Sequence, residues 1–144
     1  MKLSTKGRYG VKAMVDLAVN FQKEPVSIKS ISARQNISEY YLEQLFSPLR
    51  KEGIIKSIRG AQGGYVLGRD PKDITVYDII TVLEGEIEIS DCIENESCNN
   101  IDCCATRHLW LRIKESIDSV TKNTTLNDIV EDYNKINSRG ENNE

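Results

Sequence analysis

The spacing of apolar residues along the first fifty positions predicts three helices. The first stripe, with intervals of three and four residues, consists of Met14, Leu17, Ala18 and Phe21. Ser27 is placed to cap a short second helix, Asn36 to form the turn after it, and Ser38 to cap a third helix. The stripe of the third helix consists of Leu42, Leu45, Phe46 and Leu49. Helix, short helix, turn and helix is the order of a helix-turn-helix, although many three-helix domains share it.

Two short apolar runs directly after the third helix predict a β-hairpin. Residues 54–58 form the first predicted strand, and residues 65–67 form its partner. The connection Arg59-Gly60-Ala61-Gln62-Gly63-Gly64 contains three glycines, which permit a tight turn. A basic, glycine-rich hairpin in this place is typical of a wing. The predicted fold class is therefore mainly α, a winged helix-turn-helix with a two-stranded wing.

The second half of the chain predicts two further helices separated by a polar segment. Thr75 is placed to cap a helix that Gly85 ends. Residues 84–102 contain seven acidic residues and no basic one, and we expect a loop there. A longer helix from Cys104 to Lys122 has an apolar face of Leu109, Ile113, Ile117 and Val120. This face exceeds what a small winged domain needs, so we expect a long dimerisation helix that pairs with a second copy in a homodimer.

These patterns divide the chain into three parts. Residues 1–72 form the predicted winged helix-turn-helix DNA-binding domain, and residues 73–136 form a cysteine loop and dimerisation region. The second part ends in a short amphipathic segment that contains Leu126, Ile129, Val130 and Tyr133. Residues 137–144 are polar, and we expect them to form a disordered tail.

The charge of the chain is distributed unevenly, which the net charge of −3 conceals. Residues 1–72 carry 13 Lys and Arg against 6 Asp and Glu, whereas the remaining residues carry 6 against 16. The basic half suggests contact with a polyanion such as DNA. No apolar run approaches the roughly 18 residues of a membrane span, and the first dozen residues are polar and basic. We therefore expect a cytoplasmic protein without a membrane segment, whose cysteines are reduced.

Four cysteines lie within thirteen residues of the polar segment, at Cys92, Cys98, Cys103 and Cys104. Buried cysteines are usually scattered over apolar faces, so packing does not account for this grouping. Soft thiolates from one loop can converge on zinc or on an iron–sulfur cluster, and a redox-active thiol switch is the other alternative. Zinc sites favour Cys-x2-Cys turns, which the chain lacks. The adjacent side chains of Cys103 and Cys104 diverge in a helical turn, so only one is expected to reach the same metal.

Three strings in the chain carry a resemblance to a known family: LSTKGRYG at 3–10, YLEQLF at 41–46 and RGAQGGYVLG at 59–68. With them, residues 1–134 resemble the winged-helix regulators that include IscR, CymR and NsrR. The pattern Cys92-x5-Cys98-x5-Cys104, followed by Trp110, is most similar to the iron–sulfur-cluster regulators of the IscR type. This resemblance implies a dimer with a [2Fe–2S] cluster as its cofactor, held by Cys92, Cys98 and Cys104.

The fourth ligand that a [2Fe–2S] cluster usually requires is open in this sequence. Some IscR-type regulators have a histidine three residues after the third cysteine, where this chain has Arg107. The single histidine, His108, is shifted by one residue, which turns it by about 100° on a helix. Carboxylates replace the missing ligand in related regulators, which makes Glu43 a candidate. The candidates are therefore Glu43, His108 and Cys103.

In a helix-turn-helix, the amino-terminal residues of the recognition helix lie at base edges in the major groove. In this chain these residues are Ser38, Glu39, Tyr40, Tyr41, Glu43 and Gln44. Gln44 can pair with adenine, and Glu43 can accept a hydrogen bond from the cytosine amino group. Arg59 of the wing fits the narrow minor groove of A/T-rich DNA. We expect phosphate contacts from Lys2, Lys6, Arg8, Arg50, Lys51 and Lys56, and a packing role for Tyr9.

Together these features predict a transcriptional regulator that binds a double-stranded DNA operator and senses a [2Fe–2S] cluster. The resemblance implies repression of genes for iron–sulfur-cluster biogenesis. The alternative is a cluster-free, thiol- or metabolite-responsive regulator of sulfur metabolism of the CymR type. The basic half and the wing argue against a protein-interaction adapter or a cluster-assembly accessory. An enzyme is disfavoured, because the chain has no nucleophile–base pair and no phosphate-binding loop.

Overall fold

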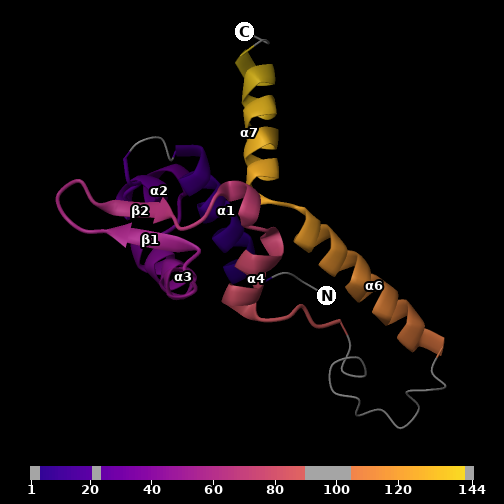
Figure 1. The fold of residues 1–144 in the computed structure, drawn as a ribbon. Helices are drawn as coiled ribbons and strands as arrows, with labels where there is room; N and C mark the ends of the chain where they lie inside the picture. The colour runs from indigo at the N-terminus through magenta and orange to yellow at the C-terminus, as the bar shows by residue number, and fades with distance from the viewer. Residues whose placement is uncertain (1–3, 21–23, 90–104, 142–144) are drawn as a thin grey trace.

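The computed structural model describes residues 4–20, 24–89 and 105–141. The elements in chain order are α1 (Thr5–Asn20), α2 (Ile28–Gln35), α3 (Glu39–Lys51), β1 (Ile55–Ile58), β2 (Gly64–Leu67), the 3₁₀ turn η1 (Pro71–Asp73), α4 (Val76–Glu84), α6 (Ala105–Asn123) and α7 (Leu126–Glu141). Helices α1–α4 and the hairpin form one body, from which α6 and α7 extend in different directions (Figure 1). This arrangement confirms the predicted fold class, a mainly α winged helix-turn-helix with a two-stranded wing.

The helix-turn-helix forms where the capping residues predict it. The Ser27 hydroxyl accepts a hydrogen bond from the Ser30 N–H at 3.1 Å, and the Ser38 hydroxyl accepts one from the Tyr41 N–H at 3.1 Å. Each bond satisfies one of the backbone donors left open at a helix start. Asn36, between α2 and α3, has a left-handed φ of 55°, which asparagine tolerates better than most residues. The turn therefore fixes the direction of α3.

The wing is tied to the chain that precedes α2. Strands β1 and β2 pair antiparallel, with Ile55 opposite Leu67. On the other edge of β2, Val26 and Tyr65 exchange two backbone hydrogen bonds of 2.9 and 2.8 Å. A Cβ atom at Gly64 would lie 2.4 Å from the Val26 carbonyl oxygen, so only glycine permits this close approach. The base of the wing is thus fixed on both sides.

The buried core consists of residues between positions 13 and 83 together with Leu126, the first residue of α7. The apolar stripe of α3 is fully buried and consists of Leu42, Leu45, Phe46 and Leu49. It packs in one cluster with residues of α1, α2 and the strands, including Met14, Leu17, Ile31 and Ile55. Ile74, Ile79, Leu83 and Leu126 belong to the same cluster, so the core crosses the predicted boundary at residue 72. That boundary stays a prediction, and Phe21 of the first predicted stripe lies outside the described residues.

Helices α1 and α4 approach each other closely because α1 has glycines at the contact. A Cβ atom at Gly10 would lie 2.1 Å from Leu83 Cδ1. At the start of α1, the Gly7 N–H donates a hydrogen bond of 2.8 Å to Glu84 Oε1. A carboxylate at this place also complements the positive end of the helix dipole. The last turn of α4 therefore holds the first turns of α1.

The junction between α6 and α7 is hydrogen-bonded to the start of α4. The Val76 N–H donates to the Thr124 carbonyl at 2.9 Å, and the Leu126 N–H donates to the Ile74 carbonyl at 2.7 Å. Thr75 and Asp78 form a reciprocal capping box at the start of α4, and Gly85 follows its end with a φ of 80°. Thr75 and Gly85 thus occupy the predicted helix ends.

The structure corrects the prediction for the carboxyl-terminal tail. Helix α7 continues through Glu141, so residues 137–141 are helical rather than disordered, and residues 142–144 lie outside the described residues. The polar composition correctly indicated the absence of a core, because the side chains of residues 131–140 are all exposed. Once a helix has formed, however, each added residue gains a backbone hydrogen bond without a new nucleation step. Arg139 in the last turn also complements the helix dipole.

Candidate nucleic-acid interface and sensor segment

Helix α3 presents its polar face to solvent. The side chains of Tyr40, Glu43 and Gln44 are exposed, while the apolar stripe on the other side of the helix is fully buried. Ser38 is exposed at the amino-terminal end, where its hydroxyl accepts the capping bond and can still donate its own proton outward. The fold therefore places these predicted base-reading residues on one accessible face.

Tyr41 differs from the other predicted base-reading residues because its ring takes part in packing. It is half-buried, and its ring meets the ring of Tyr9 edge-to-face at 6.1 Å between centroids. Tyr9 on α1 thus packs against α3, as predicted from the sequence. The contact positions the amino-terminal part of α1 beside the recognition helix.

Arg59 begins the turn of the wing, and its side chain is exposed. The turn is closed by a 3.0 Å hydrogen bond from the Gly63 N–H to the Gly60 carbonyl. In Figure 1 the hairpin extends from the body on the side that also carries α2 and α3. Recognition helix and wing therefore lie on the same side of the molecule.

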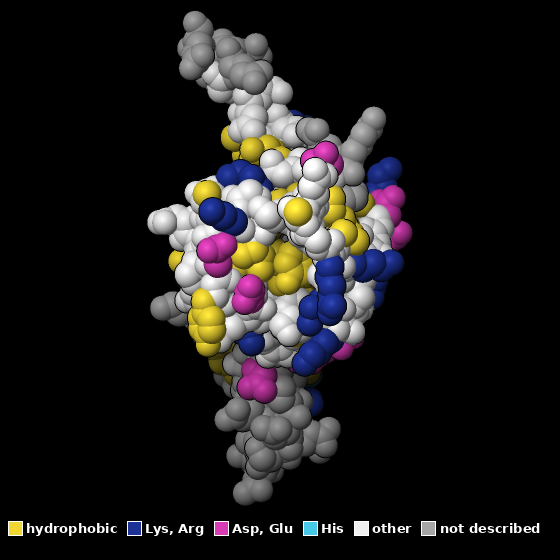
Figure 2. Space-filling view, turned by 90° about the vertical axis from the view of Figure 1, so that its left-hand side faces the viewer, with side chains coloured by type: hydrophobic (Ala, Val, Ile, Leu, Met, Phe, Trp, Pro, Cys, Tyr) yellow, Lys and Arg dark blue, Asp and Glu magenta, His cyan; other side chains and the backbone are white. Residues whose placement is uncertain are grey.

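Exposed basic side chains occur on α1, α3 and β1. They are Lys6, Arg8 and Lys12 on α1, Arg50 and Lys51 at the end of α3, and Lys56 on β1. Lys2 lies outside the described residues. Figure 2 shows the face that carries the wing, where Lys and Arg side chains gather along one edge and acidic side chains are scattered singly. The local charge, rather than the net charge of −3, suits contact with phosphates.

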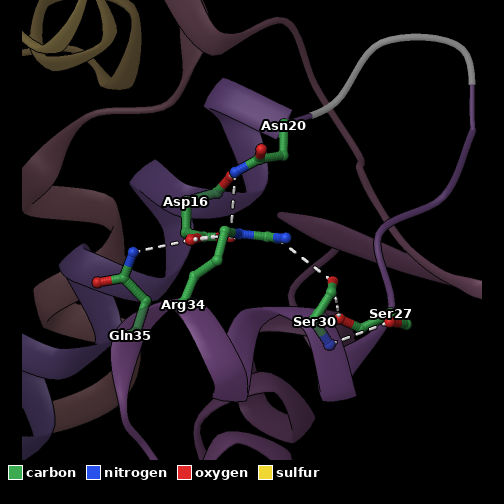
Figure 3. Close-up of polar contacts among 6 residues, drawn as sticks. All are labelled: Asp16, Asn20, Ser27, Ser30, Arg34 and Gln35. Carbon is green, nitrogen blue, oxygen red and sulfur yellow. Dashed lines mark hydrogen bonds and ion pairs between the residues drawn. The ribbon is translucent and has the colours of Figure 1, made fainter. Parts of the chain in front are cut away.

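A buried carboxylate, which was not among the residues predicted from the sequence, joins α1 to α2 (Figure 3). Asp16 is only 4% exposed and accepts hydrogen bonds from Arg34 at 2.8 and 3.0 Å and from Gln35 at 2.7 Å. The hydrogen bond to Asp16 raises the pKa of Arg34. Arg34 also donates to the Ser30 hydroxyl at 3.3 Å. The one signal in the sequence was an acidic residue between the apolar positions Met14 and Leu17 of a helix.

The four cysteines lie in residues 90–104, outside the described residues, and we call this range the cysteine segment. Within the described ranges, no three His, Cys, Asp or Glu side chains converge as a metal site. His108 is exposed near the start of α6 and Glu43 is exposed on α3, with α4 between the two helices in Figure 1. The structure does not bring these two ligand candidates together, and the ligand set stays a prediction.

Residues before and after the cysteine segment contact one another. Glu86 accepts hydrogen bonds from the Tyr77 hydroxyl at 2.6 Å and from Lys114 Nζ at 3.3 Å. Lys122 Nζ lies 4.7 Å from the centroid of the Tyr77 ring. The bond from Tyr77, followed by Lys114, lowers the pKa of Glu86, and the bond to Glu86 raises the pKa of Tyr77. The chain that enters the segment is therefore held against α6, the helix that leaves it.

Comparison with known proteins places these features in a family. Residues 3–132 match the Rrf2 family, described as "Iron-dependent Transcriptional regulator". The HTH-type transcriptional regulator CymR of Bacillus subtilis (strain 168) is 51% identical over 129 residues, which cover 90% of this chain and 89% of that protein. The HTH-type transcriptional regulator IscR of Serratia proteamaculans (strain 568) is 45% identical over 130 residues, which cover 90% and 79%.

Solved structures of the same two kinds superpose on this fold. The structure of CymR (YrzC), the global cysteine regulator of B. subtilis, has a TM-score of 0.78 at 48% identity and covers 91% of this chain and 97% of that one. IscR of T. potens has a TM-score of 0.76 at 49% identity, with coverage of 92% and 88%. No described helix is long and apolar enough to cross a membrane. These relatives are transcriptional regulators and not enzymes, and the chain belongs to the Rrf2 family of DNA-binding transcriptional regulators.

Proposed function

We propose that this protein is a homodimeric, cytoplasmic repressor whose choice of operator changes with a [2Fe–2S] cluster. The observation that carries the proposal is the spacing Cys92-x5-Cys98-x5-Cys104, placed between α4 and α6 of an Rrf2-family chain. Genes for iron–sulfur-cluster biogenesis are the proposed targets, because the amount of intact cluster would then report the need for more of it.

On DNA, the exposed face of α3 enters the major groove and the wing enters the neighbouring minor groove. Gln44 pairs with adenine, Glu43 accepts from cytosine, and Ser38 and Tyr41 contact the edge of the site. Arg59 occupies the minor groove. Lys2, Arg8, Arg50 and Lys51 pair with phosphates and so position the protein without reading sequence. The shared exposure of α3, the turn of the wing, Arg8, Arg50 and Lys51 supports this arrangement.

Pairing of α6 with its two-fold mate forms the dimer. None of the residues of α6 is buried in the single chain, although the helix is amphipathic. Leu109 is 47% exposed and Val120 is 66% exposed. A second copy would cover this face and would place two recognition helices on half-sites about 34 Å apart. A pseudo-palindromic operator follows from that symmetry.

Cys92, Cys98 and Cys104 would hold the cluster, with Glu43, His108 or Cys103 as the fourth ligand. When bound, the cluster supplies a redox-active group. Its presence depends on the supply of iron and sulfide and on the level of oxidants. Two observations support the fit. Four soft thiols occur within thirteen residues, and Arg107, three residues after Cys104, has a buried Nε atom with no hydrogen-bond partner in the described part of the chain. A guanidinium there complements the negative charge of several thiolates.

The α1–α4 contact offers a physical route from the cysteine segment to the DNA face. Glu84, six residues before the segment, bonds to the backbone of Gly7, and Lys6 and Arg8 flank that glycine. A shift of the last turn of α4 would therefore change where these two cations lie. An allosteric effect requires such a differential interaction between two states.

The second candidate keeps the DNA contacts but replaces the cluster with a thiol or metabolite signal. The similarity to CymR supports it, because CymR of B. subtilis is 51% identical to this chain and is described as the global cysteine regulator of that organism. In that case the cysteines act by reversible oxidation.

One experiment separates the two candidates. The full-length protein is purified without oxygen, and its visible absorption, iron and acid-labile sulfide are measured. We expect an iron–sulfur chromophore that Cys92→Ala, Cys98→Ala and Cys104→Ala each abolish, while Cys103→Ala, the matched control, leaves most of it. Operator binding is then compared before and after cluster removal. A colourless, iron-free protein whose DNA binding responds to thiol oxidation would instead establish the second candidate.

A further inference from the structure

Tyr40 is an aromatic side chain that the fold does not use. It is 72% exposed, the highest value among the exposed large apolar side chains of the described residues. Its neighbour Tyr41 is half-buried and packs against Tyr9. Because the ring of Tyr40 contributes little to folding, its place on the molecule points to an external contact.

That place is the first turn of the recognition helix, beside the residues proposed to read bases. Tyr40 is the second residue of α3 and precedes Glu43 and Gln44 by three and four positions. Side chains at these intervals are neighbours on one face of a helix. The ring of Tyr40 therefore lies one turn amino-terminal to the Gln44 amide, at the end of the helix that enters the groove first.

The chemistry of the major groove limits what a ring there can read. Gln44 suits adenine, and the one apolar group that base pairs present in this groove is the C5-methyl of thymine. An exposed aromatic ring gains free energy by covering a methyl group, whereas the polar base edges require donors and acceptors.

We propose that Tyr40 is a specificity-determining residue that contacts a thymine methyl group next to the base pair read by Gln44. The aromatic ring makes the contact, and the hydroxyl is not required. This inference rests on the proposed placement of α3 in the major groove.

The test uses an operator selected by the full-length wild-type protein from a randomised duplex library. Each thymine of that duplex is replaced in turn by deoxyuridine, which removes the methyl group and keeps the base pairing. We expect one position in each half-site at which the wild-type protein loses about fourfold in affinity, the value for one buried methyl-sized group. At that position, we expect Tyr40→Ala to bind the thymine duplex and the deoxyuridine duplex equally. Tyr40→Phe should retain the fourfold difference between them.

Two control variants separate this role from general effects. Tyr133→Ala removes a tyrosine on α7, away from α3, and keeps the fourfold difference. Arg59→Ala weakens binding to both duplexes and also keeps the difference, because it removes a wing contact only. We expect Tyr40→Ala to unfold at the same temperature as the wild-type protein, which would show that the substitution leaves the fold intact.

The inference is overturned if deoxyuridine has no effect on the wild-type protein at any position, or if Tyr40→Ala remains sensitive to it. It is also overturned if Tyr40→Phe behaves like Tyr40→Ala, since the hydroxyl and not the ring would then make the contact. A library from which the wild-type protein enriches no duplex would overturn the placement of α3 in the groove together with the role of Tyr40.

Discussion

Helices α3 and α6 are both amphipathic, but only α3 has its apolar face covered within the chain. Leu42, Leu45, Phe46 and Leu49 of α3 are fully buried, whereas no residue of α6 is buried. Helix α3 is therefore fixed by its own domain, and the exposed side chains that we propose face DNA are positioned before any partner binds. By contrast, the apolar face of α6 is left unburied within the described part of the chain.

The same contrast holds for charge. The half that contains α3 carries an excess of seven positive charges, and the half that contains α6 carries an excess of ten negative ones. A polyanion is attracted to the first half and repelled by the second. The proposed DNA contacts and the proposed sensing segment are thus separated along the chain, and the α1–α4 contact is one place where the two halves meet.

The largest expected effect tests the difference in burial directly. Leu45→Ala creates a cavity in the fully buried core and should lower the free energy of unfolding by about 2–5 kcal/mol. Leu109→Ala, on the exposed face of α6, should leave subunit folding almost unchanged and should raise the dissociation constant of the dimer. Denaturant unfolding and sedimentation at several protein concentrations measure the two quantities. Equal, concentration-independent destabilisation by both variants would remove the contrast.

The next prediction concerns the contact between the halves. Gly10→Ala places a Cβ atom 2.1 Å from Leu83 Cδ1 and should cost about 1–3 kcal/mol of folding free energy through overpacking. Gly140→Ala on α7 is the matched control, because a Cβ atom there meets nothing within 4 Å and should cause no loss. Thermal unfolding of the two variants gives the comparison. A Gly10→Ala protein as stable as Gly140→Ala would show that α1 and α4 can separate without cost.

The third prediction compares operator binding after the removal of one arginine from each half of the chain. Arg59→Ala in the wing should weaken binding to the selected operator by about 1–3 kcal/mol. Arg112→Ala removes the same charge from an exposed position on α6 and should have little effect. Both are measured at one fixed salt concentration, since phosphate contacts make all affinities salt-dependent. Similar losses from both substitutions would mean that long-range charge, and not the wing, determines binding.

Local signals in the sequence predicted the winged domain, because each is a short-range device. Ser27, Ser38 and Thr75 each cap a helix through a residue three positions further along the chain. Asn36 forms its turn through its own left-handed backbone conformation. The Asp16–Arg34 pair was missed because 18 residues separate its members and no periodicity relates them. The same holds for the bond between Gly7 and Glu84, whose members are 77 residues apart. In the tail, composition indicated that side chains are solvated but could not show whether α7 would continue.

The cysteine pattern is a different case, because its meaning depends on chemistry rather than on folding. Spacing and residue type suggest a thiolate site, and the resemblance to IscR suggests its metal. Relatives of both kinds are close, at 51% identity for CymR of B. subtilis and 45% for IscR of S. proteamaculans. Folding constraints are shared by both kinds of regulator, so the fold alone does not distinguish their signals.

The smallest expected effect concerns pH at the contact between α4 and α6. The pKa of Glu86 is below its ordinary value of 4.5, because the Tyr77 hydroxyl and then Lys114 favour its carboxylate form. A group with a lowered pKa stabilises the fold above its ordinary pKa, and this contribution is lost as the pH falls through the lowered value. The pKa of Tyr77 is raised above 10.0 by its bond to Glu86, so its contribution is lost only as the pH rises through that raised value. The contact should therefore be intact at neutral pH and should weaken in acid below pH 4.5.

Glu86→Gln should remove most of this dependence. The wild-type protein should unfold at a slightly higher temperature than the variant at neutral pH, and the difference should vanish in acid. The effect is small because Glu86 is exposed, and added salt should reduce it further. Glu115→Gln on α6 is the control, since its carboxylate has no hydrogen bond or ion pair within the described part of the chain. A wild-type advantage that persists unchanged into acid would show that the Glu86 carboxylate does not hold α6 against the winged domain.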